Sequence, residues 1–505
     1  MRMFIPIPYG SELAFSIMSS TQLVTAVDEF IKDIADLPTH QPLDHALEKA
    51  IRAERELRHL FASDPHNRLL QDLFIGLVDV LSLDPAIRRT RARLVNSKAD
   101  LSGHHIFPLK ATSRRGNLLP STVTDLKSFR EHWHVFTHGV LSKMTARDWE
   151  NVIVAGGSVL ACLAPPQRVI PPKELNELYQ SENYATSDID LFLWGLSPEE
   201  AKVKMESIYQ AVCSASLWNV VCVRKANVVS IHTYYPNRPL QIILRLYQSP
   251  AEILAGFDVD AACCAYDGKT VWVNPRSLSA IIRQANTIDI SRRSPSYEMR
   301  LAKYASRGFE VYIPSLERAK VNASLYDRYL PTWPRGLARL LVLERCSASN
   351  WHYCYLRFPK ATVLKKRHRG ELGLVAPPLD SPSNDAVTLT SSNYDRGIGV
   401  AKIPYGPTWT PQAIKDLVFK RDHSMNSPYS GHNTGHRHVV FAGTMQECLG
   451  SFCLTCPSLS ANMSRDIYIR GPVTFMTTNP GQQLLSGSFR PIEFGDWTTE
   501  AYTTA

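Results

Sequence analysis

Two aspartates, Asp188 and Asp190, lead into the apolar run Leu191-Phe192-Leu193. Side chains alternate between the two faces of a β-strand, so both carboxylates point the same way, about 7 Å apart. Carboxylate oxygens are the ligands that hard divalent cations prefer in proteins. The spacing therefore predicts a cation site, with Mg²⁺ or Mn²⁺ as the cofactor.

A small-residue turn, Gly156-Gly157-Ser158, follows the apolar run 152–155. Backbone without Cβ atoms can come close to a phosphate, and the N–H groups of a helix start can donate to it together with the Ser158 hydroxyl. The pattern predicts a phosphate-binding turn, with Gly156, Gly157 and Ser158 as nucleotide-binding residues. A tight turn after a core strand and a capping Asp-x-Asp would produce the same pattern.

Two-metal phosphoryl transfer needs cations held about 4 Å apart, and two carboxylates rarely suffice. Asp258 and Asp260 lie in the run 257–266, which reads as a strand, so they would share a face. Asp258 is the first choice for the third carboxylate, and Asp260 could assist or replace it. Two alternatives stay open: Asp258 caps the turn at Gly256, or the third position falls on the neutral Gln241.

Three basic residues, Arg300, Lys303 and Arg307, recur at three- and four-residue spacing. They share one face of a helix, and the planar fork of arginine pairs two phosphate oxygens at once. This face is predicted to contact a nucleoside triphosphate, RNA or another polyanion, consistent with the net charge of +9. A solvated basic stripe is the alternative.

Gly-Gly-Ser followed by Asp-x-Asp resembles the signature of the DNA polymerase beta nucleotidyltransferase superfamily, which includes CCA-adding enzymes and poly(A) polymerases. Residues 164–185 lengthen the usual spacing between the two motifs, and residues 300–309 resemble the basic helix of CCA-adding enzymes. Residues 155–160, 187–192, 257–264, 292–309 and 479–491 also resemble an uncharacterised family of fungal and protist proteins often joined to ankyrin repeats.

The superfamily resemblance implies a metal-dependent, template-independent nucleotidyltransferase. Such an enzyme moves a nucleoside monophosphate from a nucleoside triphosphate to an acceptor hydroxyl on RNA, protein or a nucleotide. The resemblance assigns the Mg²⁺ ions to Asp188, Asp190 and Asp258. The alternatives are a catalytically inactive scaffold of the same fold and a nucleic-acid-binding protein.

The tail carries Cys448, Cys453 and Cys456 at C-x4-C-x2-C spacing, with His438 among the histidines upstream. Zinc accepts a tetrahedral mixture of thiolate and imidazole, so these four residues could form a structural Zn²⁺ site. Buried thiols beside surface histidines would give the same spacing. The tail is also the expected contact for a protein partner.

Helical periodicity and apolar runs together predict an α+β protein with a mixed-sheet, nucleotidyltransferase-like core. The strands are expected at 152–155, 189–194, 220–233, 240–247, 257–266 and 271–273. The expected regions are a helical N-terminal region (1–145), the core (146–275), a basic helical region (276–365), a linker (366–400) and a β-rich C-terminal module (401–505).

Bulk composition places the chain among folded proteins with real cores, because 44% of its residues are hydrophobic. No run of 18 apolar residues could span a bilayer, and the first 20 residues lack the pattern of a secretory signal. An intracellular location, cytoplasmic or nuclear, is therefore expected, without a membrane partner.

Overall fold

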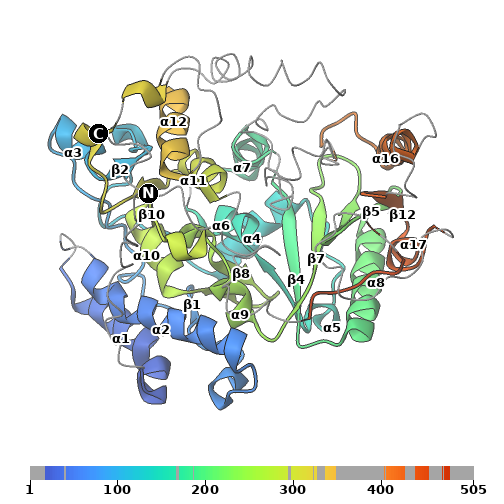
Figure 1. Ribbon diagram of the computed structural model, residues 1–505, viewed down its shortest axis with the longest axis horizontal. Coiled ribbons are helices and arrows are strands. Elements are labelled where there is room, and N and C mark those ends of the chain that lie inside the picture. The colour runs from blue at the N-terminus through green and yellow to red at the C-terminus, as the bar shows by residue number, and fades with distance from the viewer. Residues whose placement is uncertain are drawn as a thin grey trace, which may run out of the picture.

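A computed structural model describes residues 18–38, 41, 43–165, 170–185, 187–293, 297–321, 323–326, 336–348, 403, 405–426, 438–453, 469 and 471–477. Within these residues the centre of the fold is a nine-stranded sheet with the order β1-β9-β8-β3-β4-β7-β6-β5-β12 (Figure 1). Only β4 and β7 run parallel among these described pairs; the other pairs are antiparallel. This mixed sheet and its helices confirm the α+β class.

The strands of this sheet come from distant parts of the chain. They are β1 (Val78–Asp79), β3 (Val152–Ala155), β4 (Ile189–Trp194), β5 (Val221–Lys225), β6 (Val228–His232), β7 (Leu240–Tyr247), β8 (Cys264–Tyr266), β9 (Val271–Val273) and β12 (Phe441–Gly443). A smaller sheet joins β10 (Ala285–Thr287), β11 (Glu310–Tyr312) and β2 (His105–Ile106).

Helices cover the sheet and extend beyond both ends of it. Figure 1 shows α1 (Ser20–Asp36) and α2 (Asp44–Ser63) at the β1 end, and α16 (Pro411–Asn426) and α17 (Met445–Leu449) at the β12 end. The remaining α-helices of the described residues are α3 (Lys98–Ser102), α4 (Leu126–Thr137), α5 (Ala146–Trp149), α6 (Gly157–Leu163), α7 (Pro172–Gln180), α8 (Pro198–Ala215), α9 (Pro250–Ala255), α10 (Pro275–Arg283), α11 (Tyr297–Ala305) and α12 (Gly336–Ala348).

Two expected strands differ from the structure. The run 220–233 is split into the hairpin of β5 and β6, because the chain turns at residues 226–227. The run 257–266 is a strand only from Cys264 onward, and Asp260–Ala262 form a 3₁₀ turn. The Cys263 N–H donates a hydrogen bond to the Asp260 carbonyl, so these two backbone groups pair within the turn and not with a neighbouring strand. The expectation that Asp258 and Asp260 share a strand face is wrong.

The described part of the C-terminal region contains two helices and one short strand. β12 pairs antiparallel with β5, which places this region on the edge of the main sheet. Val221 and Val223 of β5 pack with Ile414 and Val418 of α16. Among the described residues, no helix is both long and apolar enough to cross a bilayer.

Candidate functional site

The carboxylate pair lies in the middle of the main sheet. Asp188 directly precedes β4 and Asp190 is its second residue, and β4 lies between β3 and β7. Both side chains keep part of their surface exposed. Burial raises the pKa of both carboxyls, and the charge of Asp188 raises that of Asp190 further. Two desolvated like charges side by side favour a proton or a cation.

Gln241 occupies the neighbouring position on the parallel strand β7. The strand register pairs it with Asp190, and its Nε2 donates a hydrogen bond to Asp188 Oδ2. The residue beside the pair is therefore a neutral amide, as one of the sequence alternatives had it. An amide oxygen can still bind a cation, but it brings no charge.

Asp258 is paired with a cation of its own. Arg300 Nη2 of α11 lies 2.8 Å from Asp258 Oδ2, and Asp258 is 1% exposed. Across the described residues, no group of three or more His, Cys, Asp or Glu side chains is arranged to hold a metal ion. The structure thus does not bring Asp258 into one cluster with Asp188 and Asp190.

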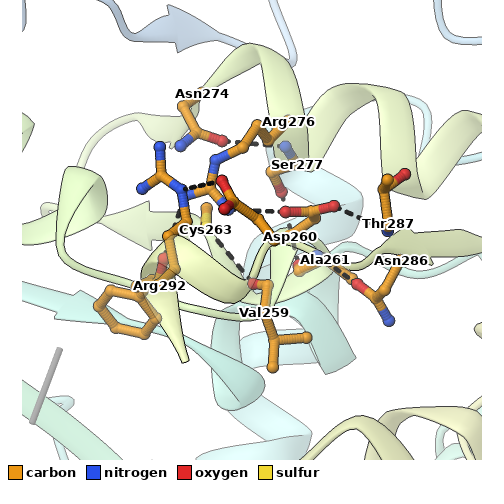
Figure 2. Close-up of polar contacts among 12 residues, drawn as sticks. Val259, Asp260, Ala261, Cys263, Asn274, Arg276, Ser277, Asn286, Thr287 and Arg292 are labelled. Atoms are coloured by element: carbon orange, nitrogen blue, oxygen red, sulfur yellow. Dashed lines mark hydrogen bonds and ion pairs between the residues drawn. The ribbon is translucent and has the colours of Figure 1, made fainter. Parts of the chain in front are cut away.

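Asp260 belongs to a buried ion network (Figure 2). Arg276 Nη1 lies 2.6 Å from Asp260 Oδ1, and the Thr287 N–H donates to Asp260 Oδ2 at 2.9 Å. Arg276 also binds Glu54 of α2 through Nε, at 2.9 Å. Both oxygens of Asp260 therefore hold α10 and β10 in place, and the predicted catalytic role of Asp260 is not supported by its position.

Gly156 is required by its backbone conformation, and Gly157 by the close packing of side chains against it. Gly156 has φ 96° and ψ −145°, which L side chains rarely adopt. A Cβ on Gly157 would lie 2.9 Å from Tyr304 Oη and 3.0 Å from Arg307 Nη1. The turn thus lets the end of α11 approach the backbone, and the predicted nucleotide-binding Gly157 lies against the predicted Arg307.

Ser158 is a buried residue at the start of α6. Its Oγ has no hydrogen-bond partner among the residues that the structure describes. Burying a hydroxyl without a partner costs free energy, so such atoms are uncommon. The hydroxyl is available to a ligand or to water, as its predicted role requires.

The basic residues of α11 and its end lie beside the carboxylate pair. The pKa of Lys303 is lowered to about 8 by burial and by the charge of Arg307, which together outweigh the opposing charges of Asp188 and Asp190. α11 ends at Ala305, so Arg307 lies in the following turn, where Nη2 donates to Ser187 Oγ at 2.6 Å. The charge of Arg300 also acts on Asp190.

These contacts make one composite site. Two desolvated carboxylates and an amide lie on the sheet, and Lys303, Arg300 and Arg307 lie beside them. The residues fit a divalent cation with an anionic ligand, since the carboxylates suit the cation and the basic groups suit phosphate oxygens.

The predicted zinc ligands are only partly described. Cys448 is buried and its thiol donates to the Cys222 carbonyl at 3.6 Å. His438 Nδ1 lies 2.7 Å from Asp422 Oδ1, and Cys456 lies outside the described residues. Zinc binding stays a prediction. Sequence reasoning missed Asp422, which no spacing to the Cys or His residues indicates.

One curated relative is the uncharacterized protein R883 of Acanthamoeba polyphaga mimivirus. It is 27% identical over 224 residues, which cover 41% of this chain and 44% of that protein. The chain therefore spans less than half the length of this relative. No solved structure matches the chain.

Residues 127–284 match the model of a family described as "Gabija anti-defense 2 family protein". This range runs from α4 to α10 and includes the carboxylate pair and Gln241. The matched family is neither a nucleotidyltransferase family nor the fungal and protist family, so the resemblance drawn from the sequence is wrong. The function inferred from this resemblance is therefore wrong as well. That inference was a nucleotidyltransferase, with an inactive scaffold of the same fold or a nucleic-acid-binding protein as the alternatives. Over its central sheet the chain is similar to the Gabija anti-defense 2 family.

Proposed function

We propose that this chain inhibits an antiphage defence system. The observation that carries the proposal is the match of residues 127–284 to a family named for Gabija anti-defence. The matched range contains Asp188 and the strands that hold Asp190 and Gln241, so it includes the carboxylate pair and its neighbouring amide. No transfer reaction is part of the proposal.

The inhibitor acts through a ligand, in this proposal a nucleoside triphosphate bound with Mg²⁺. Burial raises the pKa of both carboxyls, and the charge of Asp188 raises that of Asp190 further, so a dication between Asp188 and Asp190 would compensate both charges. Arg307 and Lys303 lie beside the pair and would neutralise phosphate charge on the same ligand. The buried Ser158 hydroxyl adds a donor near the glycine turn.

A plating assay tests the proposal. Bacteria that carry a Gabija system, and matched cells that lack it, express the full chain and are challenged with a phage that the system restricts. The chain is expected to restore plating only in cells with the system. Val203→Ala, at a side chain 72% exposed on α8, is the matched control and should act like the parent. Unchanged plating with normal accumulation of the chain would contradict the proposal.

A further inference from the structure

Ser187, the residue before Asp188, is bound by an arginine from the turn after α11. This residue, Arg307, lies 120 positions later in the chain, and its Nη2 donates to Ser187 Oγ at 2.6 Å. Its Nη2 and Nε also donate to the Asn183 carbonyl, at 2.9 and 3.1 Å. The guanidinium lies over the Tyr184 ring, 4.7 Å from the ring centroid. One side chain thus contacts a carbonyl, a ring and a hydroxyl of the segment that leads into Asp188.

A second arginine binds the same segment through its backbone. Arg238 is 1% exposed, and its Nη1 donates to the carbonyls of Tyr184 at 2.6 Å and Ser187 at 3.0 Å. Its guanidinium lies over the Phe136 ring of α4, 4.1 Å from the ring centroid. The backbone of Ser187 is therefore fixed to the core of the protein, and the hydroxyl of Ser187 is fixed to Arg307.

The contact between Arg307 and Ser187 is sheltered and closely packed. Ser187 is 4% exposed, so its hydroxyl is largely withdrawn from water. A hydrogen bond from a charged donor is stronger than a neutral one, and more so where water is excluded. A Cβ on Gly157 would lie 3.0 Å from Arg307 Nη1, so the glycine leaves room for the guanidinium. Arg307 therefore ties the segment before Asp188 to the glycine turn.

We propose that Arg307 is a positioning residue of the cation site, because its bond to Ser187 fixes where the Asp188 carboxylate lies. The inference rests on the cation site of the proposed function and adds to phosphate neutralisation by the same guanidinium. Residues that orient metal ligands from behind typically change metal affinity by roughly 10- to 100-fold. By its charge alone, an arginine beside a cation site weakens cation binding. The two roles of Arg307 therefore predict opposite effects on cation affinity when the side chain is removed.

Calorimetric titration of the full chain with Mn²⁺ tests the positioning role. Arg307→Lys keeps the charge but lacks the planar fork that binds Asn183 and Ser187 together. Ser187→Ala keeps every charge and removes one hydroxyl. Both variants are expected to bind Mn²⁺ about tenfold more weakly than the parent. The matched control is Ser347→Ala, which removes an exposed hydroxyl that donates to the Glu344 carbonyl on α12 and should keep the parent's affinity.

Two further variants separate position from charge. Arg307→Met is expected to weaken Mn²⁺ binding although it removes a positive charge, and tighter binding would overturn the proposal. In the Arg307→Lys background, Ser187→Ala should change the affinity little, because the shared hydrogen bond is already lost. Losses that add in the double variant would overturn the proposal, as would a single Arg307→Lys variant with the parent's affinity.

Melting temperatures separate the positioning role from a purely structural one. A lower melting temperature of Ser187→Ala with unchanged Mn²⁺ affinity would overturn the proposal, because the contact would then stabilise the fold alone. A parent chain that binds no Mn²⁺ would overturn it together with the cation site. The plating assay is read independently: absence of rescue by the parent would contradict the proposed function, whereas a tenfold loss of Mn²⁺ affinity in Ser187→Ala would still support the positioning role.

Discussion

At the scale of single residues, Gln241 decides how strongly the site binds a cation. Its amide lies where a third carboxylate would add negative charge beside Asp188. Gln241→Glu is therefore expected to bind Mn²⁺ more tightly than the parent, measured by calorimetric titration. Gln210→Glu adds the same charge on an exposed face of α8 and should leave the affinity unchanged. Equal affinities in the two variants would count against a cation site at this pair.

In the absence of a cation, the Asp190 carboxyl is expected to lower the free energy of unfolding at neutral pH. Its folded pKa is raised by burial and by Asp188, so the unfolded chain loses this proton at lower pH than the folded chain. The free energy of unfolding therefore falls as pH rises from the unfolded pKa of Asp190, about 4, through its folded pKa of about 7. Asp190→Asn should raise the melting temperature more at about pH 8 than at about pH 4, where the carboxyls of Asp188 and Asp190 are protonated in the folded chain because their pKa values are raised to about 6 and about 7. A gain that is the same at both pH values would show that the pKa is not raised.

Whether the sequence could predict a site residue depends on whether its position is set by nearby or by distant parts of the chain. Asp188 and Asp190 could be predicted because strand alternation is a local rule that fixes their common face. The role of Asp260 could not, since it depends on Arg276 and on Glu54, which lies on a helix more than two hundred residues earlier. Gln241 could only be offered as an alternative, because the register of β4 and β7 is a long-range property.

At the scale of elements, the buried network of Figure 2 joins α2, α10 and the turn before β8. Arg276→Met removes the shared cation and leaves Glu54 and Asp260 with less compensation in the core. A loss of about 3–5 kcal/mol in the free energy of unfolding is expected, measured by urea denaturation. Lys49→Met breaks the exposed pair of α2 with Glu29 of α1 and should change stability little.

Similar losses of unfolding free energy in Arg276→Met and Lys49→Met would contradict the conclusion that the buried network stabilises the fold. Both variants remove one cation that pairs with a carboxylate, Glu54 of α2 or Glu29 of the neighbouring α1. The two pairs differ in burial, so the difference in stability between the variants measures the effect of burial. The same network explains why the run 257–266 is not one strand: its carboxylate is bound on both oxygens, and the backbone turns to allow it.

At the scale of the whole molecule, distant segments complete one sheet. β1 pairs with β9 and β12 pairs with β5, so the two edges come from regions expected to be separate from the core. Local periodicity contains no information on such pairings, which is why the sequence predicted the central strands and the fold class but not these edges. The basic residues of α11 and of the turn after it lie beyond the family match, so the site combines residues inside and outside the matched range.

The plating assay can separate a loss of the site from a loss of the fold. Asp190→Asn is expected to remove the cation site and to abolish the rescue of phage plating, although the variant should melt no lower than the parent at about pH 8. Arg276→Met should also abolish rescue, but with a lower melting temperature. Full rescue by a folded Asp190→Asn chain would show that inhibition uses another surface. Loss of rescue at undiminished stability would place the inhibitory action at the carboxylate pair.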